Sequence, residues 1–204
     1  MTSLQGHSGE TNGIPLNLPD SEIIYFANFF SKAKADTYFN HFKREVPWQQ
    51  DDIKVFGKIY PQPRLTALYG NTGKAYSYSN ITMQPHDFTD VLLEIKQKIE
   101  TKTDAVFTTC LLNLYRDGKD SNGWHADNEK ELGLNPIIAS LTLGQERYFH
   151  LKHRKDKHLK HKLLLEHGSL LLMQGTTQHH WLHQIPKTAK TIGERINLTF
   201  RIIG

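Results

Sequence analysis

The chain has 204 residues, of which 38% are hydrophobic, so it is long enough for one domain with a substantial core and short for two. Its single cysteine, Cys110, excludes an internal disulfide and a cysteine-rich zinc module, which fits a reducing compartment. The N-terminus has no apolar leader segment, and no apolar run is long enough to cross a bilayer. We therefore expect a soluble, intracellular monomer without membrane contact, cytoplasmic in a bacterium and nuclear in a eukaryote.

The net charge of +4 is concentrated in one segment. Residues 150–162 carry six Lys or Arg against one Asp, a local charge of +5, so the rest of the chain sums to about −1. Such a basic patch suits a polyanion and the salt-dependent phosphate contacts of a nucleic-acid binder. A solvated hairpin whose lysines prevent edge-to-edge pairing explains the patch equally well. We expect the histidines of this segment to be solvated: His150, His153, His158 and His161.

The first half of the chain predicts two helices. Residues 1–20 are rich in glycine and proline and predict a flexible tail, followed by a single domain over 21–204. Ile23 to Phe29 is typical of a strand, and a helix follows from the N-cap Ser31 until Pro47. The second helix is indicated by apolar residues at helical spacing: Phe88, Val91, Leu92, Ile95 and Ile99.

From Val106 onward, short runs alternate with turn residues and no further helical period appears, which predicts a β half. The predicted strands are Val106 to Tyr115, Ile137 to Leu143, Arg147 to Lys152, Lys162 to Glu166, Ser169 to Gln174, His179 to Gln184 and Arg195 to Ile202. Two helices before a set of short strands predict an α+β, mostly β fold: a jelly roll over 106–204 with both helices packed on one side.

The pair His125-x-Asp127, together with one distant histidine, has the composition of a 2-His-1-carboxylate facial triad, which binds Fe(II) and leaves coordination positions open. By itself the pair is weak evidence, because the chain has 12 histidines. If the segment after Gln178 is a strand, His179 and His183 share one face and His180 lies on the other. Strand parity therefore removes His180 and leaves two candidates.

The predicted strand 195–202 has one polar and one apolar face. Its polar residues are Arg195, Asn197, Thr199 and Arg201. A fully exposed face is the ordinary explanation, but two guanidinium groups flanking neutral donors also form a cradle for a small dicarboxylate. Asn113 and Tyr115 share a face of another predicted strand and offer two more polar contacts.

These residues resemble the AlkB family of Fe(II)- and 2-oxoglutarate-dependent nucleic-acid dioxygenases. The matching motif is His125-x-Asp127, His183 and Arg195-x-Asn197-Leu198-Thr199-Phe200-Arg201. Further matches are Pro63-Arg64, Tyr69-Gly70, Tyr76-Ser77-Tyr78-Ser79, Asn113-Leu114-Tyr115, His167-Gly168-Ser169-Leu170 and His180-Trp181-Leu182-His183-Gln184-Ile185-Pro186, so the resemblance covers about Val55 to Ile203. Within the family, the chain is most similar to homologues that repair alkylated bases in DNA, particularly the type acting on double strands.

The resemblance implies a double-stranded β-helix, and its spacing selects His183 over His179 as the third iron ligand beside His125 and Asp127. It implies that Arg195 binds the C5 carboxylate of 2-oxoglutarate and that Arg201 lies near the C1 carboxylate. The implied hydrogen-bonding partners of this co-substrate are Asn113, Tyr115, Asn197 and Thr199. With O2, the reaction would yield succinate and CO2 and hydroxylate the N-methyl group of 1-methyladenine or 3-methylcytosine in DNA, releasing formaldehyde.

The resemblance also implies nucleotide-recognition hairpins over 55–85. Reaching the methyl group in a duplex requires base flipping, and Phe56 would fill the gap as a wedge, unless it is an ordinary core aromatic. The other implied substrate contacts are Gly57, Lys58, Arg64, Tyr76, Ser77, Tyr78, Asn128 and Glu129. Asn128 departs from the acidic residue that the family has there. The DNA is expected to be double-stranded, with single strands as a second form. The alternatives are an RNA demethylase, a protein hydroxylase, or a non-catalytic metal-containing nucleic-acid-binding module.

Overall fold

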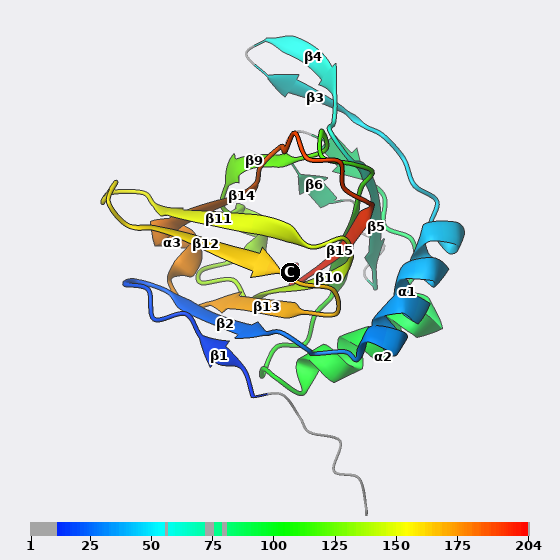
Figure 1. Cartoon of the computed structure of the whole chain (residues 1–204), viewed down its shortest axis with the longest axis horizontal. Helices are drawn as coiled ribbons and strands as arrows, with labels where there is room; N and C mark the ends of the chain where they lie inside the picture. The colour runs from blue at the N-terminus through cyan, green and yellow to red at the C-terminus, as the bar shows by residue number, and fades with distance from the viewer. Residues whose placement is uncertain (1–11, 56, 72–75, 79–80, 204) are drawn as a thin grey trace, which may run out of the picture.

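Two facing antiparallel sheets form the body of the computed structural model, which describes residues 12–203 except 56, 72–75, 79 and 80 (Figure 1). The larger sheet contains, in spatial order, β1 (Ile14–Pro15), β2 (Glu22–Phe26), β13 (Leu170–Gln174), β10 (Ile138–Gly144), β15 (Arg195–Arg201), β8 (Thr109–Tyr115) and β5 (Leu65–Gly70). The smaller sheet contains β12 (Lys160–Leu165), β11 (Arg147–His153), β14 (Trp181–Ile185) and β9 (Asn122–His125). The predicted jelly-roll fold is confirmed, but its larger sheet also contains β2 and β5, which precede the predicted core 106–204, and β5 lies within the segment 55–85 predicted as recognition hairpins.

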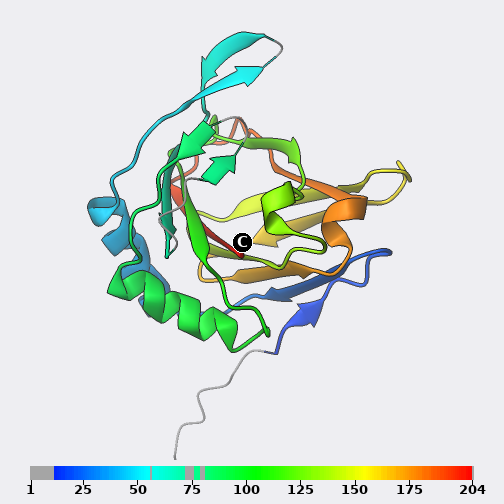
Figure 2. The ribbon, with the colours of Figure 1, turned by 180° about the vertical axis from the view of Figure 1, so that it is seen from behind.

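The outer face of the larger sheet is covered by two helices, α1 (Lys32–Glu45) and α2 (Asp90–Glu100). Both lie on the side of the molecule away from β11 and β12 (Figures 1 and 2). As predicted, α1 begins after Ser31, whose side chain accepts a hydrogen bond from a backbone N–H of the first turn, and Thr89 caps α2 in the same way. The apolar stripes of both helices pack against outward side chains such as Leu112 and Leu198. The predicted helices on one side are therefore confirmed.

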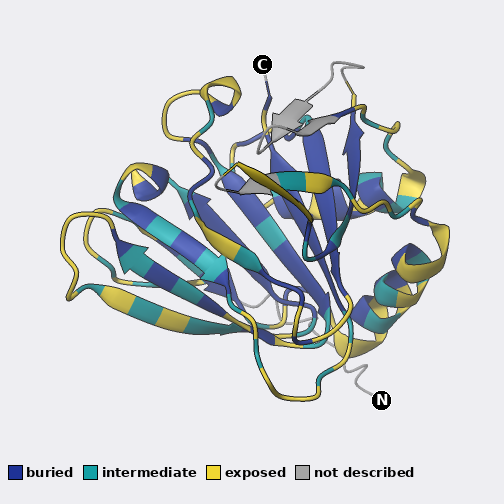
Figure 3. Cartoon of the chain, turned by 90° about the horizontal axis from the view of Figure 1, so that it is seen from above, coloured by how far each residue is buried: buried dark blue, intermediate teal, exposed yellow. Residues whose placement is uncertain are grey.

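The inner face of the larger sheet meets the smaller sheet and holds a second apolar cluster. The strands of the larger sheet are largely buried, whereas the strands of the smaller sheet alternate between buried and more exposed residues (Figure 3). On β15, Ile196, Leu198 and Phe200 pack toward the helices, so strand alternation turns the polar side chains between them inward. This polar row enters the space between the sheets, where the apolar packing stops.

Two small hairpins lie between the helices in the chain. They are β3 (Asp52–Val55) with β4 (Lys58–Pro61), and β6 (Tyr76–Tyr78) with β7 (Ile81–Met83). The β3–β4 hairpin projects beyond the two sheets, and every residue of β4 is exposed (Figure 1). Across the parts of the chain that the structure describes, no helix has the length and apolar composition needed to cross a membrane.

Part of the segment predicted as a flexible tail is an edge strand. Ile14–Pro15 pairs with β2, and the indole Nε1 of Trp181 donates a hydrogen bond to the Pro19 carbonyl oxygen at 2.8 Å. Ile14, Pro15 and Pro19 therefore contact the body of the domain, which glycine and proline content did not reveal. Residues 1–11 lie outside the described residues.

The predicted strand His179 to Gln184 begins too early. Thr177–His180 forms a single helical turn, α3, and β14 starts at Trp181. One turn is too short to produce a helical period in the sequence, so pattern analysis missed it. The prediction assumed that His179 and His183 lie on the same strand, and this assumption was wrong. A short 3₁₀ helix, Lys130–Leu132, was also missed.

Candidate active site

A buried triad lies where β9 meets β14. Their pairing sets His125 directly opposite His183, and Asp127 follows two residues after the end of β9. One ligand atom from each of the three side chains lies within 4.8 Å of the others. The imidazole rings are 4.3 Å apart at an angle of 67°. Because imidazole lone pairs lie in the ring plane, rings at this angle can direct two lone pairs at one ion.

His179, the other candidate ligand, lies away from this group. It is exposed on α3, and its Nε2 lies 2.9 Å from the Asn135 side-chain oxygen. The structure thus brings His183 and not His179 to the His125-x-Asp127 pair.

The surroundings of both histidines favour the neutral ligand form. The carbonyl oxygen of Gly123 lies 2.7 Å from Nδ1 of His125, which assigns the proton to Nδ1 and makes Nε2 the acceptor. In this structure Nε2 faces the amide nitrogen of Asn122 at 3.2 Å, a contact that an ion would replace. Burial lowers the pKa of His125 and, with His125 adding to the effect, lowers the pKa of His183 to about 3. Phe149 stacks on the His183 ring at 5.1 Å and fixes its plane.

Asp127 is held as an anion from two directions. Burial alone would raise the pKa of this carboxyl, but the charge of Arg201 and the two histidines lower it to about 2. Nη2 of Arg201 donates to Oδ1 of Asp127 at 2.8 Å. The Asp127 backbone N–H donates to the side-chain oxygen Oε1 of Gln178 at 2.9 Å. Two neutral imidazoles and one carboxylate form a donor set suited to Fe(II).

A cavity that is partly open to solvent adjoins the triad. Its polar lining combines the triad with inward side chains of β8 and β15: Asn113, Tyr115, Arg195, Asn197, Thr199 and Arg201. All six are buried, so an exposed polar face on β15 is excluded. The strand pairing explains their convergence, because Arg195 lies opposite Tyr115 and Asn197 opposite Asn113.

Arg195 is the most informative of these side chains. Its residue is only 1% exposed, and Nη2 donates to Oγ1 of Thr142 at 2.9 Å. Nε and Nη1 are buried without a hydrogen-bond partner among the described residues. Burial lowers the pKa of Arg195 to about 10, so the group stays charged at neutral pH. A buried cation with two unsatisfied donors fits a carboxylate of a ligand, and the lining as a whole fits the dicarboxylate 2-oxoglutarate.

The neutral lining residues are oriented by neighbouring groups. The amide nitrogen of Asn197 donates to Oγ of Ser140 at 2.8 Å, and its oxygen accepts from Thr199. Arg64, predicted as a substrate contact, is instead buried and donates through Nε to Asn113 at 2.8 Å. The structure therefore places Arg64 behind the cavity wall, where its charge is satisfied by the protein.

The remaining predicted substrate residues either do not line the cavity or lie outside the described set. Lys58 and Asn128 are exposed, and Gly57 has a positive φ of 80° in the β3–β4 turn. Glu129 is half-buried, its Oε2 has no hydrogen-bond partner among the described residues, and burial raises its pKa. Phe56 and the side chains of Tyr76, Ser77 and Tyr78 lie outside what the structure describes.

Several supporting residues had no predicted role. Gln178 is uncharged and belongs to no recognised motif, and the sequence around Phe149 is typical of an ordinary aromatic residue on a strand. Arg147 is buried, lies 5.7 Å from the Tyr115 ring centre, and donates to the backbone oxygens of Asp120 and Pro186. Strand alternation could have predicted the burial of Arg147, because it puts Arg147 on the same inward face as Phe149.

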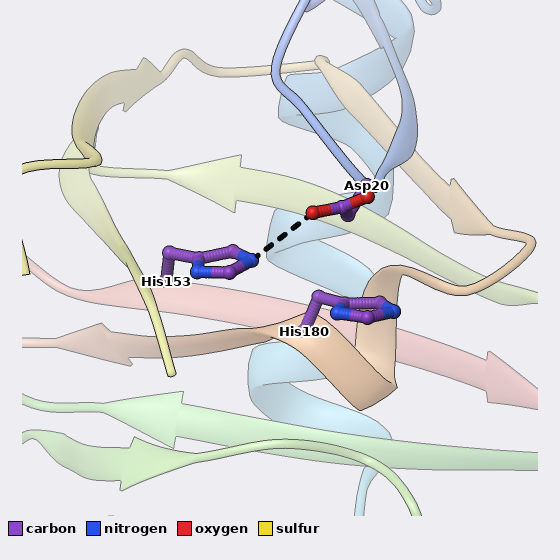
Figure 4. A group of neighbouring side chains, drawn as sticks. All are labelled: Asp20, His153 and His180. Atoms are coloured by element: carbon purple, nitrogen blue, oxygen red, sulfur yellow. Dashed lines mark ion pairs between the residues drawn. The ribbon is translucent and has the colours of Figure 1, made fainter. Parts of the chain in front are cut away.

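A second cluster, Asp20, His153 and His180, also brings three ligand atoms within 4.8 Å (Figure 4). His153 was predicted to be solvated, but it is buried because its ring packs against Trp181 and His180, which come from distant sequence. The ring planes of the two histidines are stacked at 9°, so their in-plane lone pairs do not converge.

The tautomer of His153 also disfavours a metal. The Asp156 backbone N–H donates to Nδ1, so the neutral ring carries its proton on Nε2, which faces the Asp20 carboxylate at 3.4 Å. This cluster connects the segment before β2 to the β11–β12 hairpin, and the triad at His125 is the better metal site.

The basic hairpin keeps most of its charge at the surface. Arg154, Lys155, Lys157, Lys160 and Lys162 are exposed. The ammonium of Lys152 lies 4.2 Å from the ring centre of Trp124, which is itself 39% exposed beside His125. Cationic and aromatic groups therefore adjoin the site at the surface.

Comparison with known proteins agrees with this geometry. The family model of the 2OG-Fe(II) oxygenase superfamily matches residues 22–201. The DNA oxidative demethylase ALKBH2 of Homo sapiens is 38% identical over 185 residues, which cover 85% of this chain and 70% of that protein. The chain therefore belongs to the 2OG-Fe(II) oxygenase superfamily and, within it, to the AlkB family. This membership implies Fe(II) and 2-oxoglutarate as the groups that the site binds.

Two further relatives define the extent of the similarity. The alpha-ketoglutarate-dependent dioxygenase alkB homolog 3 of Bos taurus is 41% identical over 197 residues, which cover 90% of this chain. The chain spans 66% of the length of that relative, just under two thirds. A solved structure of OsALKBH1 has a TM-score of 0.62 at 17% identity and covers 88% of this chain and 96% of that one, which supports the fold alone.

Proposed function

We propose that this protein is an Fe(II)- and 2-oxoglutarate-dependent dioxygenase that removes N-linked methyl groups from damaged bases in DNA. The observation that carries the enzymatic part is the buried cavity in which a neutral-His, anionic-Asp triad adjoins a buried arginine with two unsatisfied donors. A purely structural metal site has no need for a dicarboxylate cradle beside it.

The residues divide into two groups by chemistry. His125, Asp127 and His183 would hold the iron, and Arg195 would bind the distal carboxylate of 2-oxoglutarate through Nε and Nη1. Arg201, already paired with Asp127, places a second positive charge near the metal end of the cavity. The neutral hydrogen-bonding groups of the lining are Asn113, Tyr115, Asn197 and Thr199.

When bound, the iron and 2-oxoglutarate supply the oxidation: O2 is reduced as 2-oxoglutarate loses CO2 to give succinate, and one oxygen atom enters a C–H bond of the N-methyl group. The resulting N-hydroxymethyl group would then lose its hydroxyl proton and leave as formaldehyde, and the electron pair of the broken N–C bond would return to the base nitrogen. The protein contributes orientation, because Arg195 is held in a buried position and Phe149 packs on the ring of His183.

The DNA part of the proposal rests on the named activity of the ALKBH2 relatives and on surface charge. The exposed lysines of the β11–β12 hairpin suit phosphate groups, and the projecting β3–β4 hairpin suits contact with a duplex. We propose Phe56, which lies between β3 and β4 in the sequence and outside the described residues, as the wedge that fills the gap left by a flipped base. Glu129, beside the triad, would face the base.

Mass spectrometry of a duplex oligonucleotide with one 1-methyladenine tests the proposal. The protein is incubated with Fe(II), ascorbate and 2-oxoglutarate, and parallel reactions use single-stranded DNA, RNA or no 2-oxoglutarate. The proposal predicts loss of one methyl group from DNA only when 2-oxoglutarate is present, and no loss with the His183→Ala variant. Demethylation of RNA alone would refute DNA as the substrate, and methyl loss without 2-oxoglutarate would refute the reaction.

A further inference from the structure

Asp127 is the one predicted iron ligand whose backbone lies outside the sheets. β9 ends at His125 and the next described element is the 3₁₀ turn at Lys130, so no strand pairing fixes the main chain at Asp127. The residue is nevertheless buried, and its backbone N–H requires a partner because burying it unpaired is costly.

That partner is the side chain of Gln178, which is fully buried in α3. Oε1 accepts the hydrogen bond from Asp127 at 2.9 Å, while Nε2 points to Sδ of Met173 at 3.6 Å. The backbone N–H of Asp127 sets the orientation of the Gln178 carboxamide. In the flipped orientation, the side-chain NH2 would face the Asp127 N–H, and the side-chain oxygen would lie beside the sulfur of Met173.

Gln178 also lies five positions before His183, in the segment that runs from α3 into β14. Its hydrogen bond therefore joins the loop that carries Asp127 to the segment that carries the distal histidine. Arg201 fixes the same aspartate from the other end, through the carboxylate. Together, the two contacts hold the Asp127 side chain in the position where it faces the two imidazoles.

From this geometry we infer that Gln178 is a positioning residue for metal binding: it holds Asp127 at the distance from His183 that one ion requires. This rests on the proposed function only in taking the triad as the metal site. Gln178 does not touch the metal or the co-substrate cavity, and it acts through the Asp127 backbone. Outer contacts of this kind commonly change metal affinity by about 10- to 100-fold when they are removed.

Titration of the apoprotein with Mn(II), with free ion measured by electron paramagnetic resonance, tests the inference without catalysis. Gln178→Met keeps the side-chain length and removes the acceptor, and Gln178→Asn keeps an amide that is one methylene too short to reach. His179→Ala, on the exposed side of the same helix, is the matched control. We expect both Gln178 variants to bind Mn(II) at least about 10-fold more weakly than the control.

A folded Gln178→Met or Gln178→Asn variant that binds Mn(II) within about 2-fold of His179→Ala would overturn the inference, even if its apoprotein melts at a lower temperature. If Gln178→Met does not fold, Gln178→Asn decides. Failure of the metal site itself has a different signature: wild-type protein that does not bind Mn(II), or binding that His183→Ala leaves unchanged.

Discussion

Arg195 and Arg201 lie on the same face of β15 and are both buried, yet their replacement by methionine is predicted to have very different effects on the stability of the apoprotein. Arg201 donates to Asp127 at 2.8 Å, whereas two donor atoms of Arg195 have no hydrogen-bond partner among the described residues. Removing Arg201 leaves a buried carboxylate without its main counter-charge. Removing Arg195 takes away a cation that the ligand-free protein satisfies only in part, through Thr142 and the ring of Tyr115.

The magnitudes follow from these contacts. Breaking one side of a buried ion pair costs about 3–5 kcal/mol, so Arg201→Met should lower the melting temperature by about 10 °C in a chain of this size. The depression of the Arg195 pKa from its usual 12.5 to about 10 corresponds to about 3 kcal/mol spent on keeping this group charged in the fold. Loss of the Thr142 contact offsets part of that gain. Arg195→Met should therefore change apoprotein stability by less than about 1 kcal/mol or increase it.

Arg195 contributes little to the stability of the apoprotein but is expected to contribute strongly to the binding of 2-oxoglutarate. Two charge-assisted hydrogen bonds contribute about 1.5–3 kcal/mol each, so their loss should weaken 2-oxoglutarate binding by about 150-fold or more. Thermal unfolding of the metal-free variants and calorimetric titration of 2-oxoglutarate with Mn(II) present measure the two effects. The reasoning fails if Arg195→Met destabilises the apoprotein as much as Arg201→Met does, or if it binds 2-oxoglutarate within about 3-fold of wild type.

Two further predictions concern the cavity wall and the basic hairpin. Arg64→Met removes the hydrogen bond to Asn113, so KM for 2-oxoglutarate should rise about 10-fold with little change in kcat. Both constants are measured from the rate of succinate release. If only KM for DNA rises, Arg64 is a substrate contact after all. Replacing Lys155 and Lys157 with Ala should weaken DNA binding. It should also reduce the slope of log K against the logarithm of the salt concentration by about 0.9 per lost phosphate contact. The control, Lys32→Ala on α1, should leave this slope unchanged. Equal slopes for the hairpin and helix variants, from fluorescence anisotropy titrations at several salt concentrations, would remove the hairpin from the interface.

Strand alternation predicted the most important part of the site. The sequence 195–201 separates polar from apolar side chains, and the structure buries the polar row in the cavity. Alternation alone did not decide whether that row faces solvent or a ligand, because this depends on the smaller sheet that covers it. That sheet includes β9, a short strand containing Gly123, which pattern analysis missed.

The choice between histidines was beyond pattern analysis for a related reason. Strand parity failed at His179 because α3 interrupts the strand, and pairing of His183 with His125 exists only in the tertiary fold. The prediction that His153 is solvated failed similarly, because His153 lies in a polar stretch of sequence and partners from a distant segment bury it. Local composition predicts average exposure, whereas contacts between distant segments decide it.

The central claim is that oxidation of 2-oxoglutarate at this site is coupled to demethylation of DNA. Its most direct test is to quantify succinate, formaldehyde and unmethylated adenine in one reaction containing Fe(II), 2-oxoglutarate, O2 and methylated duplex. The account predicts equal amounts of all three products and slower succinate release when the same duplex lacks the methyl group. Succinate formed at the same rate with either duplex, without formaldehyde, would contradict it.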